Sequence, residues 1–141
     1  GYVSRMDNIQ AAFLNYKLKN LKSIILKRRK NVEIYKKKLD RNSVFFIDER
    51  KEEFNTYHTF VVQVEKRDKL RKFLLKKNIS TSIHYPVPIH LQPASSKYGY
   101  KKGDFKNTEE QAKKILTLPI NENLNRKHIE YICKSINMFY K

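Results

Sequence analysis

A short run at residues 82–94 contains most of the side chains that could do chemistry. Its prolines, at positions 86, 88 and 93, restrict the backbone before any ligand arrives, which suits a binding surface. Among them lie ring and amide side chains that can form hydrogen bonds with hydroxyl and phosphate groups: His84, Tyr85, His90 and Gln92. We predict that this set binds a ligand bearing such groups. The alternative is a rigid connection in which both histidines bond only backbone carbonyl groups.

Other catalytic constellations are missing from the sequence. His84 and His90 have no cysteine or carboxylate near them in the chain, so no metal site is expected. There is no Gly-rich phosphate loop, and no Ser, His and Asp follow one another as in a catalytic triad. A Schiff-base lysine must be desolvated, whereas the lysines here fall on polar helix faces or in charged runs. From its residues alone, the chain is a basic domain without catalytic residues or metal ligands of its own.

A long helix is predicted ahead of this run, at about residues 5–40. Ser4 can cap it, and Asp7 lies three residues further on, near the positive end of the helix. Apolar residues then recur at alternating steps of three and four, which is typical of one helical stripe: Leu14, Leu18, Leu21, Ile25, Val32, Tyr35 and Leu39. A coiled coil would use the same spacing. The mixture of Ile, Tyr and Arg28 in the stripe favours packing onto a domain.

The middle of the chain predicts a small sheet. Residues 43–47 form a short apolar run, and residues 57–64 alternate in the manner of a half-buried strand. An amphipathic helix is expected at residues 67–77. Asn78 can then adopt a left-handed conformation, and residues 79–85 return as a second strand. Strand, helix and strand in this order predict a sheet with a helix on one face.

The remaining elements complete the fold. The prolines make residues 86–103 an irregular loop. Asn107 or Thr108 caps a helix, and residues 116–120 are extended. A last helix starts at Asn125 and has one apolar face: Ile129, Ile132, Cys133, Ile136 and Phe139. The predicted fold class is α+β, a small antiparallel or mixed sheet with flanking helices, preceded by the long N-terminal helix.

The composition limits the kinds of partner that we expect for the chain. The 141 residues suffice for one domain, and the formal net charge is +17 at pH 7. A basic nucleic-acid-binding module is therefore an alternative, and its affinity would fall steeply with salt. The basic residues fall on every predicted element instead of one stripe, which favours general over-use of lysine and no nucleic-acid partner. With one cysteine, Cys133, no signal peptide and no membrane-spanning apolar run, we expect a cytoplasmic protein without a membrane partner.

Three stretches resemble signatures of the sugar aminotransferases of the DegT/DnrJ/EryC1/StrS family. The first is Gly1-Tyr-Val-Ser-Arg-Met-Asp-Asn-Ile-Gln-Ala-Ala12. The second is Ile83-His-Tyr-Pro-Val-Pro-Ile-His-Leu-Gln-Pro-Ala94. The third is Gly99-Tyr-Lys-Lys-Gly-Asp-Phe105, followed by Leu116-Thr-Leu-Pro-Ile120. They occur in the order and at the spacing that the family has, from the first residue to the end of the chain.

The resemblance implies a function that the residues alone do not. Family members are fold-type I enzymes that use pyridoxal 5'-phosphate (PLP) and act as homodimers, with active sites at the subunit interface. They transfer an amino group, usually from glutamate, to a keto-sugar carried by a nucleotide, and so make amino sugars for surface polysaccharides. Residues 1–141 match the smaller C-terminal domain with the interdomain helix that leads into it. The PLP-binding large domain and its Schiff-base lysine are then absent, and the chain is expected to be inactive alone.

Two alternative activities within the family stay open. Some relatives dehydrate a sugar instead of aminating it, and others aminate cyclitols. The lysine position that separates these activities lies outside the sequence.

The resemblance also suggests roles for single residues. In the family, the loop that contains Ser4 and Arg5 reaches into the neighbouring subunit's site, toward the PLP phosphate, so both are candidate cofactor-binding residues. The asparagine that helps to hold this phosphate in the family is replaced by Val3, which cannot donate a hydrogen bond. The second stretch lines the substrate side of the site, which makes His84, Tyr85, His90 and Gln92 candidate substrate-binding residues. Ser95 stands where the family commonly has tyrosine.

Overall fold

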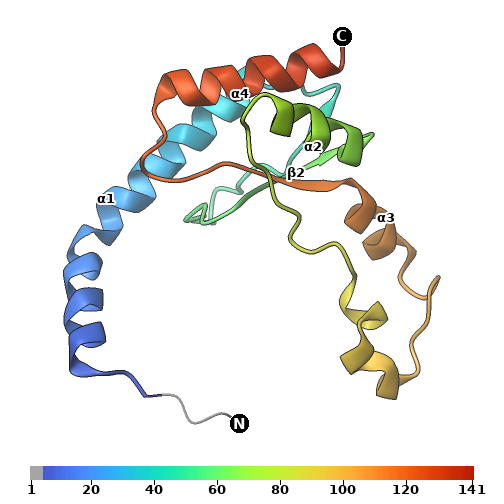
Figure 1. Cartoon of the computed structure of the whole chain (residues 1–141), viewed down its shortest axis with the longest axis horizontal. Helices are drawn as coiled ribbons and strands as arrows, with labels where there is room; N and C mark the ends of the chain where they lie inside the picture. Colours follow the sequence, from blue (N-terminus) through green and yellow to red (C-terminus); the bar gives the residue numbers. More distant parts are fainter. Residues whose placement is uncertain (1–4) are drawn as a thin grey trace.

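The structure is a computed structural model that describes residues 5–141. Its elements are, in chain order, α1 (Asn8–Lys38), β1 (Val44–Phe45), β2 (Phe60–Val64), α2 (Arg67–Lys76), the 3-10 helices η1 (Ile89–Leu91) and η2 (Pro93–Tyr98), α3 (Lys106–Lys114), β3 (Ile115–Leu118) and α4 (Arg126–Phe139). Figure 1 shows a small helix-covered sheet from which two extensions project: the N-terminal half of α1, in blue, and a segment in yellow and orange. We call residues 82–105 of the second extension the proline arm.

The sheet has three antiparallel strands in the order β1-β2-β3. Val44 pairs with Val64, and Phe60 pairs with Leu118. The alternation of β2 follows the prediction, because Phe60, Val62 and Val64 are buried and the two residues between them are half-exposed. The predicted α+β class is therefore confirmed, and the sheet is antiparallel.

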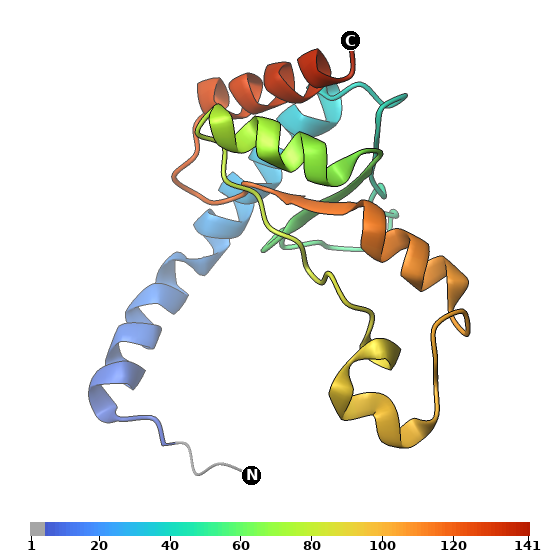
Figure 2. The same ribbon diagram turned by 45° about the vertical axis from the view of Figure 1, so that its right-hand side comes forward.

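Helices α2 and α4 and the C-terminal part of α1 lie on the same side of this sheet (Figures 1 and 2). They enclose one apolar core, in which α4 contributes Ile129, Ile132, Cys133 and Ile136. Asn125 caps α4 as predicted, since its side-chain oxygen accepts the backbone N–H of His128 at 3.1 Å. Asn78 ends the α2 region with a φ of 57°, the left-handed conformation that its residue type allows.

The start of α1 differs from the prediction. Ser4 lies outside the described residues, and the helix begins at Asn8 with Asp7 as its N-cap. The Gln10 side chain accepts the backbone N–H of Asp7 at 3.2 Å, which satisfies one of the exposed donors at the helix start. The side chains of Asp7 and Gln10 therefore cap the helix, which was the role expected of Ser4.

The apolar stripe of α1 is core over only half of its length. Tyr35 is fully buried, and its hydroxyl donates to the carbonyl oxygen of Pro119 at 2.9 Å. Near the other end, Leu14 and Leu18 are 52% and 64% exposed. The expectation that the whole stripe packs onto this domain is wrong for the residues before Ile25, because the sheet and α4 do not reach them (Figure 1).

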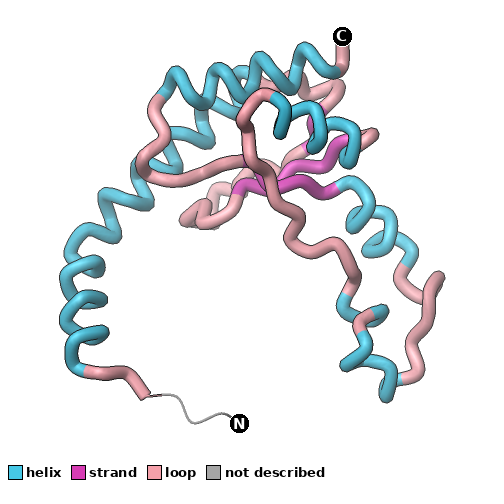
Figure 3. The backbone as a smooth tube through the Cα atoms, viewed as in Figure 1, coloured by secondary structure: helices cyan, strands magenta, loops and turns pink. Residues whose placement is uncertain are grey.

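Three further expectations are corrected between residue 79 and the start of α3. Residues 79–85 do not form a strand, because only Ser82 bridges to Thr117 before the prolines take the chain away from the sheet edge. Residues 86–103 are not wholly irregular, since η1 and η2 provide two short helical pieces there (Figure 3). Helix α3 also begins earlier than expected, with Phe105 as its N-cap. No helix within residues 5–141 has the length and apolar character needed to span a membrane.

Candidate functional site

The predicted ligand-binding residues gather on the proline arm, and their surroundings differ. His84 lies at the base of the arm, where its Nδ1 atom is 2.9 Å from the hydroxyl oxygen of Thr117 in β3. Because Nδ1 is used in this way, Nε2 is the nitrogen that remains for a ligand. Tyr85 follows with 71% of its surface exposed, and its ring meets that of His84 edge-on at 5.5 Å. These two residues present polar groups to the outside.

His90 is placed in the opposite way. Its Nε2 atom lies 3.1 Å from Oε1 of Glu109 in α3, and the two side chains are only 8% and 11% exposed. The Phe105 ring covers the imidazole with its centroid at 4.8 Å. His90 is therefore turned into the arm, away from the surface that carries Tyr85. The sequence offered no signal for this contact, because Glu109 follows His90 by 19 residues.

Glu109 also joins the far end of the arm to the same point. Its Oε1 atom accepts the backbone N–H of Gly103 at 2.7 Å. This hydrogen bond lowers the pKa of Glu109 below its ordinary value, and His90 adds to the effect. The carboxylate is thus charged at neutral pH and can act as the common acceptor for both partners.

Gln92 and Ser95 shape the tip of the arm. The Gln92 side chain is exposed and donates to the carbonyl oxygen of Val87 at 3.3 Å. The hydroxyl of Ser95 is buried and donates to the carbonyl oxygens of Ile89 and Gln92. At position 95 a small hydroxyl side chain therefore closes the turn between η1 and η2.

Of the candidate cofactor-binding residues, the structure describes only Arg5, which precedes the other extension. Ser4 and Val3 are outside the described residues, and Arg5 is exposed ahead of α1. Figures 1 and 2 show the first turns of α1 and the proline arm on opposite sides of the molecule. The chain by itself does not bring Arg5 together with His84 or Tyr85, so their roles toward a cofactor or substrate stay predictions.

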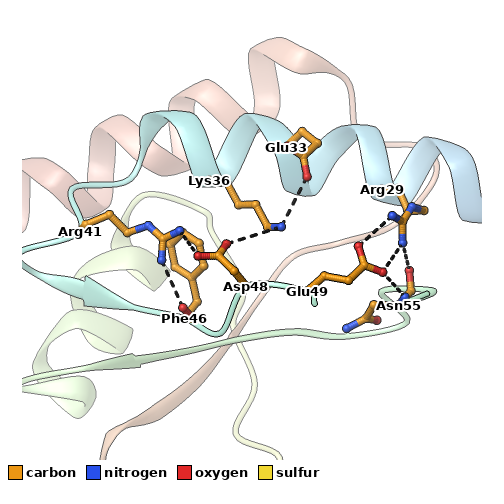
Figure 4. A network of polar contacts seen from close by, with 8 residues as sticks. All are labelled: Arg29, Glu33, Lys36, Arg41, Phe46, Asp48, Glu49 and Asn55. Atoms are coloured by element: carbon orange, nitrogen blue, oxygen red, sulfur yellow. Dashed lines mark hydrogen bonds and ion pairs between the residues drawn. The ribbon is translucent and has the colours of Figure 1, made fainter. Parts of the chain in front are cut away.

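An unpredicted polar cluster holds the loop of residues 48–57 against α1 (Figure 4). The two terminal nitrogens of Arg29 each lie 2.8 Å from a carboxylate oxygen of Glu49, and Nη1 also donates to the carbonyl oxygen of Asn55 at 2.7 Å. The Phe54 ring lies 4.5 Å from the guanidinium group. We call Arg29, Glu49, Phe54 and Asn55 the arginine clamp. Arg29, and then the backbone N–H of Asn55, lower the pKa of Glu49 to about 2.

A second group of ion pairs continues the cluster toward the end of α1 (Figure 4). Arg41 donates to Asp48 at 2.7 Å and to the carbonyl oxygen of Phe46 at 3.2 Å. Lys36 lies between Glu33 and Asp48, at 3.5 and 3.7 Å. These charges explain why the strongly charged loop after β1 is ordered against the helix instead of projecting from it.

The same pairs bear on whether the chain could hold pyridoxal phosphate by a lysine. Lys36 is well covered, with 16% of its side chain exposed. Burial alone would lower its pKa, but Tyr57, Glu33 and Asp48 outweigh this and raise the pKa above its ordinary value. A Schiff-base lysine needs the opposite shift. Lys36 therefore does not fit the cofactor, and in residues 5–141 no group of three or more His, Cys, Asp or Glu side chains could hold a metal.

The comparison with protein families matches residues 1–137 to the DegT/DnrJ/EryC1/StrS aminotransferase family. The chain belongs to this family. The resemblance of its three signature stretches is thereby confirmed.

Individual relatives agree over the whole chain. It is 34% identical to a protein of Geobacillus stearothermophilus named "Pleiotropic regulatory protein", with 100% of this chain and 39% of the relative covered. It is 30% identical to the "dTDP-3-amino-3,6-dideoxy-alpha-D-galactopyranose transaminase" of Aneurinibacillus thermoaerophilus, with 99% and 38% covered. The chain thus spans less than two fifths of the length of these relatives.

Solved structures give the same correspondence. The crystal structure of S. venezuelae DesV in complex with a ketimine intermediate superposes with a TM-score of 0.91 at 30% identity, over 100% of this chain and 38% of that one. An aminotransferase of the family from Brucella abortus superposes with a TM-score of 0.89 at 29% identity, over 99% and 37%. The two extensions are therefore part of a shared fold and not a peculiarity of this chain.

Proposed function

We propose that this chain is the C-terminal small domain of a PLP-dependent aminotransferase that transfers an amino group from glutamate to a nucleotide-linked keto-sugar. The observation that carries the proposal is the superposition of the entire chain, extensions included, on DesV in its ketimine complex. The names of two relatives, both transaminases of dTDP-linked amino sugars, support the substrate class. The product would be an amino sugar for a surface polysaccharide.

The proline arm would supply the substrate side of the site. Nε2 of His84 and the hydroxyl of Tyr85 are placed to form hydrogen bonds with sugar hydroxyl or diphosphate oxygens, because His84 is anchored through its other nitrogen and Tyr85 is exposed. The exposed Gln92 amide lies further along the same arm. Arg5 would contribute a charged contact to the cofactor phosphate from the opposite extension.

The rest of the site would come from outside this chain. Pyridoxal phosphate would carry the amino group between the two substrates, and its lysine would belong to the remainder of the parent protein. We propose that the parent acts as a cytoplasmic homodimer in which the two extensions of each subunit contact the large domains. The exposed apolar side chains on the first half of α1 are consistent with such a cover.

The experiment that tests the proposal uses the full-length parent protein with PLP. It is mixed with glutamate and a set of keto-sugar nucleotides, and formation of 2-oxoglutarate and of the amino sugar is followed by mass spectrometry. Equal amounts of both products are expected. If no keto-sugar nucleotide gives 2-oxoglutarate, the proposed transamination is wrong. Consumption of a sugar nucleotide without 2-oxoglutarate would instead indicate the dehydratase alternative.

A further inference from the structure

The proline arm has two attachment points on one continuous element. Helix α3 runs directly into β3, so Lys106 to Leu118 form a single helix-strand unit. At the strand end of this unit, His84 bonds the hydroxyl of Thr117, and Ser82 exchanges backbone hydrogen bonds with the same residue at 2.7 and 3.2 Å. At the helix end, His90 bonds Glu109. The chain between His84 and His90 therefore spans two fixed points.

Most residues within this span are exposed. Tyr85, Val87 and Ile89 all lie at the surface, and Ile89 is 80% exposed. In Figures 1 and 2 this part of the arm extends away from the helix-covered sheet, so it receives no support from the main core. Its shape must be set by the two attachment points and by contacts within the arm itself.

The second attachment point has the features of a built contact. Both side chains are nearly buried, the Nε2 to Oε1 distance is 3.1 Å, and Phe105 covers the imidazole. A hydrogen bond to a charged, poorly solvated carboxylate is stronger than an exposed one. Gly103 donates to the same Oε1 atom, so Glu109 holds His90 and the far end of the arm at one place on α3. We call His90 and Glu109 the arm latch.

We propose that the arm latch consists of positioning residues: His90 and Glu109 hold the span from Tyr85 to Ile89 in the shape that receives the keto-sugar nucleotide, and His90 itself does not touch it. The inference rests on the proposed function and assigns His90 a different part in it from that of His84 and Tyr85. A latch of this kind acts on the binding of one substrate through geometry. It therefore predicts an effect on KM for the sugar nucleotide and none on glutamate.

The test uses the full-length enzyme with four changes: His90→Ala, His90→Gln, Glu109→Ala and the double change to alanine at both positions. The matched control is Glu110→Ala, because Glu110 is the neighbouring glutamate on α3 and pairs only locally with Lys113. Loss of a buried hydrogen bond to a carboxylate should raise KM for the sugar nucleotide about ten-fold or more. KM for glutamate should stay within about two-fold of the wild type, as should both constants of the control.

Two relations among the variants distinguish a latch from a general loss of structure. The effects of His90→Ala and Glu109→Ala should not add in the double variant, because each removes the same contact. His90→Gln should recover much of the lost affinity, since its amide nitrogen can donate to Glu109 in place of Nε2. His90→Gln could raise KM for the sugar nucleotide as much as His90→Ala does, while the arm stays attached to Glu109. His90 would then touch the substrate, and the inference would be overturned.

Whether the arm is held in place can be measured without following the enzymatic reaction. Lys97, Lys101 and Lys102 are exposed within it, so trypsin cleavage there reports local opening. Cleavage at these sites should be about ten-fold faster in both alanine variants and unchanged in the control. Unchanged cleavage in His90→Ala would mean that the latch does not hold the arm. Faster cleavage with an unaltered KM would mean that it does not position the substrate. Because this readout needs no reaction, an inactive wild-type enzyme would refute the proposed function without deciding the latch.

Discussion

The two halves of α1 share one apolar periodicity and have opposite surroundings. Tyr35, in the C-terminal half, is fully buried, whereas Leu14 and Leu18, in the N-terminal half, are exposed on the same stripe. The change occurs at Arg28 and Arg29. Each of these arginines is paired with a carboxylate from a different loop, at 3.1 and 2.8 Å.

This difference shows what helical periodicity does and does not report. Apolar residues at alternating steps of three and four show which face of a helix is apolar. The residues that cover this face must come from another part of the protein. For the C-terminal half the cover is the sheet and α4. For the N-terminal half we propose that it is the part of the parent protein that the longer relatives also possess.

Of the substitutions in α1, one at Tyr35 should lower the stability of the folded chain most. Replacing it with alanine should lower the free energy of unfolding of this chain by about 3–5 kcal/mol, because a large buried ring is lost and a cavity remains. Urea unfolding followed by circular dichroism measures the change. A loss below about 1 kcal/mol would show that the C-terminal half of α1 is not part of a packed core.

The Tyr35 hydroxyl can be separated from its ring. In Tyr35→Phe the stacking on Phe60, at 5.2 Å, is retained, but the carbonyl oxygen of Pro119 loses its donor. Leaving this part-buried acceptor without its donor should cost up to about 3 kcal/mol. The same unfolding measurement applies, and a cost equal to that of the alanine variant would mean that the ring contributes little.

The boundary between the halves is sensitive to acid through the arginine clamp. The pKa of Glu49 is about 2 in the folded chain, below its ordinary value of 4.5. A lowered carboxyl pKa stabilises the folded state above the ordinary pKa, and this contribution is lost as the pH falls from about 4.5 toward 2. Glu49→Gln should flatten this part of the curve of melting temperature against pH. The control is Glu52→Gln in the same loop, an exposed glutamate for which an unaltered curve is expected.

The smallest effect is expected at the exposed half of α1. Leu18→Ser should change the free energy of unfolding of this chain by less than about 0.5 kcal/mol, since the side chain is 64% exposed here. In the parent protein the same change should cost about 2 kcal/mol or more if the half is covered there. Thermal unfolding of both proteins decides this, and equal small effects would remove the proposed cover.

Several elements could be read from local residue types. Asn125 begins α4, Asn78 takes the left-handed conformation after α2, and β2 alternates as its residues predict. For the two asparagines the deciding interaction lies within a few residues of chain, and for β2 the alternation of residue types marks the face that is buried. The error at residues 79–85 has the same origin in reverse, because a strand-like composition cannot exist as a strand without a partner edge along its length.

The candidate site shows a similar division. The prolines and ring residues identified the arm, and the structure places His84 and Tyr85 with the exposure that a binding role requires. The inward turn of His90 could not be predicted, because its partner Glu109 carries no mark that separates it from Glu110. Thr117, which anchors His84, was expected only as part of an extended piece.

The sequence by itself determined the α+β class, the caps and apolar faces of its helices, and the family, since these depend on residue types at short or family-defined spacings. The tertiary structure decided how far α1 is buried, where the chain leaves the sheet, and which histidine of the arm faces inward. These depend on residues 19 to 84 positions apart, as in His90 with Glu109 and Tyr35 with Pro119, which meet only when the chain has folded.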